Sequence, residues 1–119
     1  MKTNDENVIV AKSYAFAVRS VKLYRYLSDE KHDYVIGRQL MRSGTSIGAN
    51  VKEAIRGVSK ADFTAKMSIS LKEASESEFW IELLRDTDYI SSQQAESMLA
   101  DCQELLKLLM TIIKTSKNQ

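Results

Sequence analysis

Very few residues in this 119-residue sequence carry side chains suited to catalysis. The one histidine, His32, lies in a charged segment, and the one cysteine, Cys102, falls at an apolar position of a helical pattern. A Cys–His pair would have to join these two residues across unrelated elements. We interpret His32 as a solvated turn residue and Cys102 as a buried structural thiol. The sequence therefore predicts no catalytic residue, and we expect a protein that is not an enzyme.

Acidic residues gather in the third quarter of the chain, but their pattern does not predict a metal site. Helical bundles that hold two irons use Glu-x-x-His pairs, and the sequence has none. Carboxylates alone can hold a hard cation, although a solvated acidic face is the simpler interpretation. We predict no metal and no cofactor. The acidic residues are Glu73, Glu76, Glu82, Asp86 and Asp88.

Basic residues in the first half of the chain are the stronger lead. They recur at helical spacing, so their side chains are expected on the outer faces of two neighbouring helices. Such a surface would attract a phosphate backbone without reading bases, and tyrosines beside it would add stacking. The alternative is a charged face that serves solubility. The candidate nucleic-acid residues are Lys12, Arg19, Lys22, Arg25, Arg38, Arg42, Lys52 and Arg56, and the tyrosines are Tyr14, Tyr24, Tyr26 and Tyr34.

The overall charge limits this hypothesis. The net charge is only +1, whereas constitutive nucleic-acid binders are usually strongly basic. Residues 1–60 hold eleven Lys or Arg against six Asp or Glu, and residues 61–119 hold six against ten. A basic face therefore requires a fold that separates the first half of the chain from the second.

Four segments with helical periodicity must position these residues. They span roughly residues 7–28, 34–56, 60–86 and 92–114, with apolar side chains at spacings of three and four. The chain has no proline, which suits long helices joined by short turns. Short turns make successive helices antiparallel. We predict an all-α fold, a single domain over residues 1–119, in which four helices form an up-down-up-down bundle.

Helix boundaries are marked by residues that pair with free backbone groups. A Ser or Thr followed three residues later by an acid or Gln predicts a capping box, and a glycine after the last turn predicts the end of a helix. The boxes are expected at Thr3 with Glu6, Ser59 with Asp62 and Ser91 with Gln94, and the terminating glycine at Gly57.

Two glycines in the second helix indicate a close helix contact. Gly44 and Gly48 are four residues apart, and each costs about 1 kcal/mol relative to alanine in a helix interior. Close approach of another helix offsets that cost. The third helix offers a matching small surface at Ser70, Ala74 and Ser77, so we expect the second and third helices to cross there.

A polar face accompanies these glycines. Its members recur at spacings of three and four along the second helix. We interpret the face as an internal hydrogen-bond network that fixes helix register or subunit contacts, with a ligand pocket as the alternative. The residues are Ser43, Ser46, Asn50 and Glu53.

The last helix carries a second apolar line beside its core positions, which leaves a narrow polar stripe. We predict that a second copy of the chain covers this surplus, so that the protein is a homo-oligomer. The alternative is that flanking helices of the same chain cover it. The expected interface residues are Leu99, Leu106, Leu108, Met110 and Ile113.

Location follows from the cysteine count and the apolar runs. One cysteine cannot form an intramolecular disulfide, so a reducing compartment is expected. The N-terminal residues are polar, and the apolar run at residues 105–113 is broken and too short to cross a bilayer. We expect a cytoplasmic protein with no membrane partner.

Several stretches resemble one known family over nearly the whole chain. Residues 42–50 read RSGTSIGAN, residues 59–63 read SKADF, and Lys72-Glu73-Ala74 and Phe79-Trp80 follow. These are similar to the bacterial four-helix bundle proteins known as 23S ribosomal RNA intervening-sequence proteins. The C-terminal residues 108–117 resemble the family as well.

The resemblance implies a four-helix bundle that associates as a ring, a pentamer, with no catalytic residues. More distantly, similar bundles are accessory proteins of diversity-generating retroelements, where a basic pentamer binds nucleic acid and a reverse transcriptase. This more distant resemblance therefore implies RNA or DNA as a partner, with a protein partner as the alternative. This chain departs from the family pattern at Lys52, where a second acidic residue is expected, and at Ser75, where relatives often have Arg.

Overall fold

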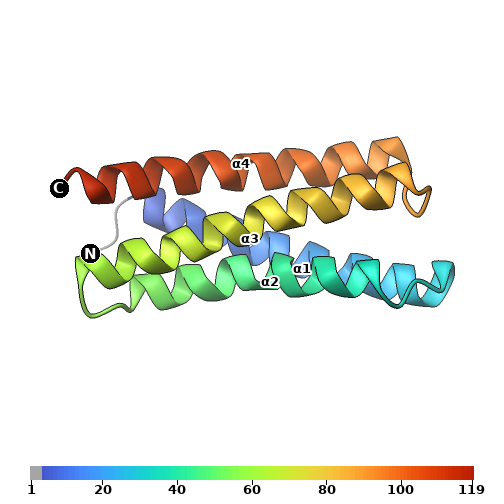
Figure 1. Cartoon of the computed structure of the whole chain (residues 1–119), viewed down its shortest axis with the longest axis horizontal. Helices are drawn as coiled ribbons and strands as arrows, with labels where there is room; N and C mark the ends of the chain where they lie inside the picture. The colour runs from blue at the N-terminus through green and yellow to red at the C-terminus, as the bar shows by residue number, and fades with distance from the viewer. Residues whose placement is uncertain (1–3) are drawn as a thin grey trace.

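A computed structural model describes residues 4–119 as four long helices. They are α1 (Asn4–Lys31), α2 (Ile36–Ile55), α3 (Lys60–Asp86) and α4 (Ser92–Lys117). Each helix is antiparallel to the next, and the contacting pairs are α1 with α2, α2 with α3, α3 with α4 and α1 with α4 (Figure 1). The helices therefore occupy the corners of a square, as the predicted up-down-up-down bundle requires. The molecule measures 46 × 21 × 18 Å.

The helix bounds differ from the expected ones by a few residues. Helix α1 begins three residues earlier and ends three later, α2 is shorter at its start, and α4 continues to Lys117. The first expected capping box involves Thr3, which lies outside the described residues. Among residues 4–119, no helix is long and apolar enough to cross a membrane.

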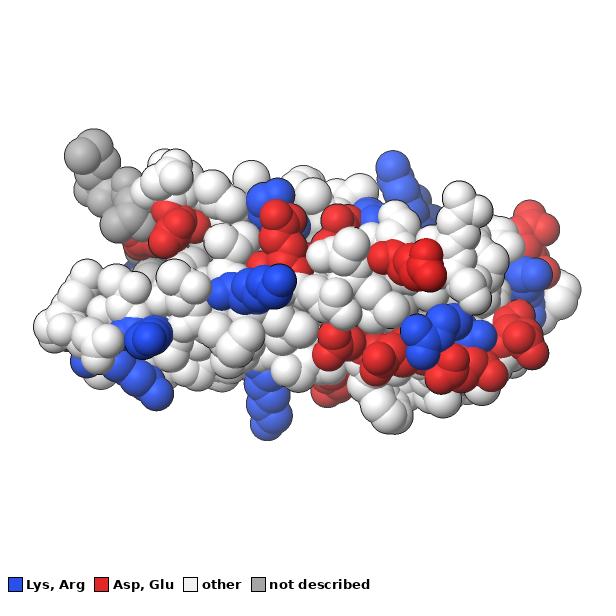
Figure 2. Space-filling model, turned by 90° about the horizontal axis from the view of Figure 1, so that it is seen from above, with Lys and Arg blue, Asp and Glu red and all other residues white. Residues whose placement is uncertain are grey.

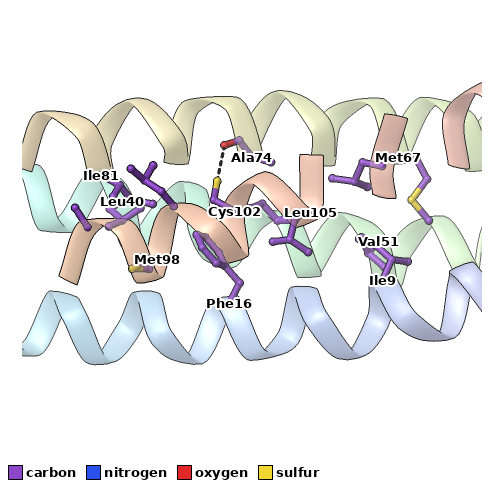
Figure 3. Close-up of a cluster of buried hydrophobic side chains, with 14 of the residues drawn as sticks. Ile9, Phe16, Leu40, Val51, Met67, Ala74, Ile81, Met98, Cys102 and Leu105 are labelled. Carbon is purple, nitrogen blue, oxygen red and sulfur yellow. Dashed lines mark hydrogen bonds between the residues drawn. The ribbon is translucent and has the colours of Figure 1, made fainter. Parts of the chain in front are cut away.

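The core runs along the bundle axis and takes side chains from every helix. Ile9 and Phe16 of α1, Val51 of α2 and Met67 of α3 are almost completely buried. Figure 3 shows these side chains converging with those of α4, where Cys102 Sγ donates a hydrogen bond to the carbonyl oxygen of Ala74 at 3.3 Å. The bundle is thus held by apolar side chains at the spacings that the sequence shows.

The helix starts are fixed by side-chain caps. Ser59 Oγ accepts a hydrogen bond from the Asp62 backbone N–H at 3.0 Å. Ser91 and Gln94 form the complete capping box, with Ser91 N–H donating to Gln94 Oε1 and Gln94 N–H donating to Ser91 Oγ. The predicted box at Ser91 is confirmed, whereas at Ser59 the structure shows the serine cap alone.

The start of α2 has a cap that the sequence pattern did not predict. The buried carboxylate of Asp33 accepts hydrogen bonds from the backbone N–H groups of Val35, Ile36 and Gly37 at 2.7–3.1 Å. These bonds satisfy donors that have no partner within the helix. Asp33 therefore both ends the turn after α1 and begins α2.

Gly57 ends α2 in a different way from the one expected. It follows the last turn, but no glycine of the described chain has a positive φ, so it does not adopt the left-handed conformation of the usual terminating glycine. A Cβ at this position would lie 3.1 Å from the Ala54 carbonyl oxygen and against the Asp62 carboxylate. Position 57 therefore favours glycine because a larger side chain would crowd these two groups.

The predicted role of Gly44 and Gly48 is wrong in its choice of helix. A Cβ on Gly44 would lie 2.8 Å from Ser20 Cβ, and one on Gly48 would lie 3.3 Å from the Ser13 carbonyl oxygen. Both glycines therefore face α1. The contact between α2 and α3 uses serines instead: Ser43 and Ser77 hydroxyls are 2.8 Å apart, and Ser70 Oγ donates to the Ile47 carbonyl at 2.8 Å.

The second apolar line of α4 is mostly covered within the same chain. Leu99 and Ile113, which were predicted as interface residues, are only 8% exposed and so offer little surface to a second copy. Leu99 lies three residues before Cys102, which bonds to Ala74 of α3, so this side of α4 is turned toward α3. Leu106 and Leu108 are half-buried against the core, and Met110 is exposed.

Candidate nucleic-acid interface

The central parts of α1 and α2 carry positive charge without nearby negative charge in the sequence. Residues 7–28 and residues 34–52 contain no Asp or Glu. Seven of the eight candidate basic residues lie within these stretches, and Arg56 lies just beyond the second. Arg19 is half-buried, and the other seven are exposed. Acidic partners for them must therefore come largely from α3 and α4.

At the edge between α1 and α4, two candidates are paired. Lys12 Nζ lies 3.0 Å from Glu104 Oε1, and Arg19 Nη1 lies 2.6 Å from Asp101 Oδ2. Arg19 also donates to the carbonyl and the hydroxyl oxygens of Ser97. These pairs are solvent-exposed and worth about 1 kcal/mol or less each, but they neutralise the positive charge at this edge.

At the edge between α2 and α3, Arg42 is held in the same way. Its guanidinium pairs with the carboxylates of Glu73 and Glu76, and the Trp80 indole N–H donates to Glu76 Oε2 at 3.0 Å. Arg42 thus links two helices and is not a free cation.

The other five candidates have no partner. Within residues 4–119, neither a hydrogen bond nor an ion pair engages any of their side chains, and all five side chains are exposed. Three lie along one face of α2, because residues 38, 52 and 56 are separated by fourteen and four positions. The five residues, which we call the free cations, are Lys22, Arg25, Arg38, Lys52 and Arg56.

The helix contacts order the free cations along the bundle. A Cβ on Gly37 would meet Leu27, and one on Gly48 would meet Ser13, so α2 runs antiparallel to α1 in this register. Arg25 and Arg38 therefore lie toward the α1–α2 turn. Lys52 and Arg56 lie toward the opposite end.

A groove of about 410 Å³ lies between α1 and α2 at the Lys52 end. Its floor is mainly apolar, its rim includes Lys52 and Arg56, and none of its lining residues is acidic. We call it the α1/α2 groove. Its lining residues are Val10, Ser13, Tyr14, Ala17, Thr45, Gly48, Ala49, Val51, Lys52, Ile55 and Arg56.

The face over α4 has a different character. Figure 2, viewed from the α4 side, shows Lys and Arg side chains interspersed with Asp and Glu side chains rather than gathered in one patch. Ion pairs such as Lys12 with Glu104 and Arg85 with Asp86 account for part of this alternation. Mixed charge of this kind gives little attraction to a polyanion.

The polar face predicted on α2 is only partly internal. Ser43 is buried and bonds across to Ser77. Ser46 Oγ and Asn50 Nδ2 donate to carbonyl oxygens of their own helix, four residues earlier. Glu53 lies at the surface, where its carboxylate is 3.2 Å from Lys66 Nζ. The four residues do not converge on a pocket.

The two residues with potential catalytic side chains, His32 and Cys102, lie in different environments. His32 is exposed in the α1–α2 turn, with Nδ1 3.3 Å from the Tyr34 hydroxyl. Cys102 is buried in the core, and burial raises the pKa of its thiol from 9.0 to about 12. In the described part of the chain, no group of three or more His, Cys, Asp or Glu side chains is placed to hold a metal ion.

The fold and these sequence stretches can be compared with known proteins. A family described as 23S rRNA-intervening sequence protein matches residues 5–111. The chain belongs to this family. The match covers the whole bundle except the last turns of α4, so all the free cations lie inside it.

A solved structure shares both the fold and much of the sequence. It is the crystal structure of a protein with unknown function from the S23 ribosomal protein family of Bacteroides thetaiotaomicron. It is 51% identical, with a TM-score of 0.91, and the alignment covers 92% of this chain and 98% of the other. No curated protein matches the sequence. The family is thus established together with the four-helix fold.

Proposed function

We propose that this member of the 23S rRNA-intervening sequence protein family is a non-enzymatic, homo-oligomeric binding module that holds RNA or DNA by its phosphate backbone. The observation that carries the proposal is the set of five free cations on α1 and α2. The other three candidates, Lys12, Arg19 and Arg42, are already ion-paired within the chain, so they are less available to bind phosphates.

The spacing of the free cations suits a polyanion. Arg38 lies in α2 and Arg56 directly follows its last residue, eighteen positions later, which is about 27 Å at 1.5 Å per helical residue. A nucleic-acid backbone presents phosphates along that whole length, and releasing its counterions drives binding without reading the bases. Side chains that contact only phosphates position the ligand, so we expect little sequence preference.

An oligomer would strengthen weak contacts of this kind. A ring of subunits, a pentamer by analogy with similar bundles, would present the α1 and α2 cations repeatedly to one strand, and linked sites bind more tightly than single ones. Met110 is 52% exposed and offers one apolar contact for such assembly. Native mass spectrometry gives the subunit number, and a monomer at high concentration would exclude the ring.

The nucleic-acid proposal is tested by two charge-matched variants. One replaces Arg38, Lys52 and Arg56 with Ala, and the control replaces Lys107, Lys114 and Lys117, three exposed lysines of α4 without partners in the described chain. Each variant removes three positive charges. In a fluorescence anisotropy titration with labelled RNA at low salt, we expect the α2 variant to bind about tenfold or more weakly.

The control variant is expected to bind nearly as the parent protein does, because its lysines lie on the face with mixed charge. Equal losses in both variants would show that only net charge matters. No binding by the parent protein at low salt would exclude the proposal.

A second candidate function is a scaffold for a protein partner. Phe79 is 55% exposed and Ile69 is 42% exposed on the outer side of α3, and Phe79 stacks edge-on against Trp80 at a centroid distance of 5.0 Å. Exposed aromatic side chains of this kind are common centres of protein interfaces. Purification with a stoichiometric protein, free of nucleic acid, would favour this function.

A further inference from the structure

We infer that the α1/α2 groove takes a base of a single-stranded RNA or DNA segment, with Tyr14 as its stacking platform and Lys52 and Arg56 on the flanking phosphates. The inference rests on the proposed function and narrows it to unpaired strands. It concerns one groove and three side chains, whereas the proposed function concerns the charge of the whole α1 and α2 surface.

The shape of the groove suits a flat, apolar group. Its volume of about 410 Å³ falls at the lower end of the range for small-molecule sites. Its lining includes Ala17, Gly48 and Ala49, which have minimal side chains and leave room for a ligand. A duplex is too wide to enter such a groove, whereas a single base extruded from a strand can.

Tyr14 is placed to stack on that base. It lines the groove although 71% of its surface is exposed, which makes it the most exposed aromatic residue of the described chain. An exposed aromatic ring costs solubility and contributes little to the core. Stacking on an unpaired base gives such a ring a role, because every base has a face that can be stacked regardless of sequence.

The charge at the rim selects an anionic ligand. Lys52 and Arg56 both line the groove, neither has a partner within residues 4–119, and no lining residue is acidic. A nucleotide supplies what this arrangement lacks, namely an apolar base face for the floor and phosphates for the rim.

A second copy of the chain is a less suitable occupant. If Ile69 and Phe79 on α3 of a second copy filled the groove, carboxylates of the same helix would have to reach Lys52 and Arg56. Glu73 and Glu76, which lie between Ile69 and Phe79 on that helix, already pair with Arg42 of their own chain. Those two carboxylates could neutralise the rim only if their pairs with Arg42 broke.

The test compares a labelled single strand of uridines with an RNA duplex of the same length, using fluorescence anisotropy on the full-length protein. Tyr14→Ala is expected to weaken binding of the single strand about fivefold or more, the effect of losing one stacked base. Its effect on duplex binding should be under twofold. Tyr14→Phe, which keeps the ring, should bind the single strand as the parent does.

Phe79→Ala is the matched control, because Phe79 is also an exposed aromatic residue, at 55%, but lies on α3, outside the groove. It should leave single-strand binding unchanged. Ultraviolet crosslinking of the uridine strand should label the peptide that contains Tyr14.

The outcomes separate this inference from the proposed function. If Tyr14→Ala and Phe79→Ala bind the single strand alike while the parent still binds both RNAs, the groove inference is overturned and backbone binding stands. If the parent binds neither RNA at low salt, both fall. If Tyr14→Ala changes the subunit number measured by native mass spectrometry, the groove is an interface between copies and the inference is overturned.

Discussion

Asp33 shows how one side chain can determine where a helix begins. Its carboxylate is buried and accepts three backbone N–H groups at the start of α2. Removing it would leave those donors without this partner, and the Gly37 N–H among them is buried. The α1–α2 turn also positions Arg25 and Arg38, so this cap supports one end of the candidate nucleic-acid surface.

We therefore expect Asp33→Ala to lower the free energy of unfolding by about 1–2 kcal/mol, the usual effect of losing a helix cap. Urea denaturation followed by circular dichroism measures it. Asp29→Ala is the control, because Asp29 is exposed and has no partner in the described chain, and it should change stability by about 0.5 kcal/mol or less. Equal stability of the two variants would show that the cap contributes nothing.

The protonation of the buried Cys102 thiol makes the stability of the protein depend on pH. Burial is the main cause of its raised pKa, and the carboxylates of Glu78, Asp101 and Glu82 act in the same direction. Because the thiol holds its proton more tightly in the folded state than in the unfolded state, its contribution to stability is complete below about pH 9 and is lost as the pH rises toward about 12.

The expected result is a steeper loss of stability with pH in the parent protein than in Cys102→Ala. The difference in slope should approach about 1.4 kcal/mol per pH unit for a single proton. Urea denaturation of both proteins at several alkaline pH values measures it. Parallel curves would mean that the thiol is not buried as described.

Single residues were predicted from the sequence where the signal was local. The caps at Ser59 and Ser91 follow from residues three positions apart, so chain-local spacing was sufficient. Asp33 was not predicted as a cap, because no acidic residue or Gln follows it three positions later, and its role depends on the turn bringing its side chain back to the helix. Pairing of Arg19 with Asp101 joins residues far apart in the chain, which spacing cannot predict.

At the scale of helices, Gly44 also shows that spacing along the chain does not predict which helices come into contact. Glycines four apart predicted a close contact on one face of α2, and the contact exists. The sequence could not show that this face is turned toward α1, because the rotation of α2 depends on how all four helices pack together. The serines Ser43 and Ser70 then make the contact with α3 that the glycines were expected to make.

We expect Gly44→Ala to lower the free energy of unfolding by about 1–3 kcal/mol through overpacking, although alanine favours a helix by about 1 kcal/mol. The added Cβ would lie 2.8 Å from Ser20 Cβ and 3.3 Å from Phe16 Cε2. Adding Ser20→Gly to this variant removes the clash and should recover part of the loss in a denaturation measurement. A Gly44→Ala protein as stable as the parent would contradict the contact with α1.

At the scale of the whole molecule, the four-helix bundle was predicted from periodicity, turn spacing and the absence of proline, and it is confirmed. The surplus apolar line of α4 was less informative. Its width in sequence predicted a partner copy, but Leu99 and Ile113 are buried within the chain. Counting apolar positions on one helix does not reveal how much of it a neighbouring helix such as α3 covers.

The charge pattern also becomes clear only in the assembled bundle. The sequence identified eight basic residues on α1 and α2, and the fold divides them into three that pair with α3 or α4 and five that stay free. These five cations lie in α1 and α2 or, for Arg56, directly after α2, and residues 7–28 and 34–52 contain no Asp or Glu, although the protein as a whole is near neutral. This distribution of charge supports the proposed role in binding a phosphate backbone.

The most direct measurement of that role is the salt dependence of RNA binding by the parent protein and by the variant lacking Arg38, Lys52 and Arg56. We predict that the logarithm of the association constant falls linearly with the logarithm of salt concentration, and that the variant's slope is smaller by about one for each cation that contacts a phosphate. A parent affinity that is absent at low salt or indifferent to salt would contradict the proposal, as would an unchanged slope in the variant.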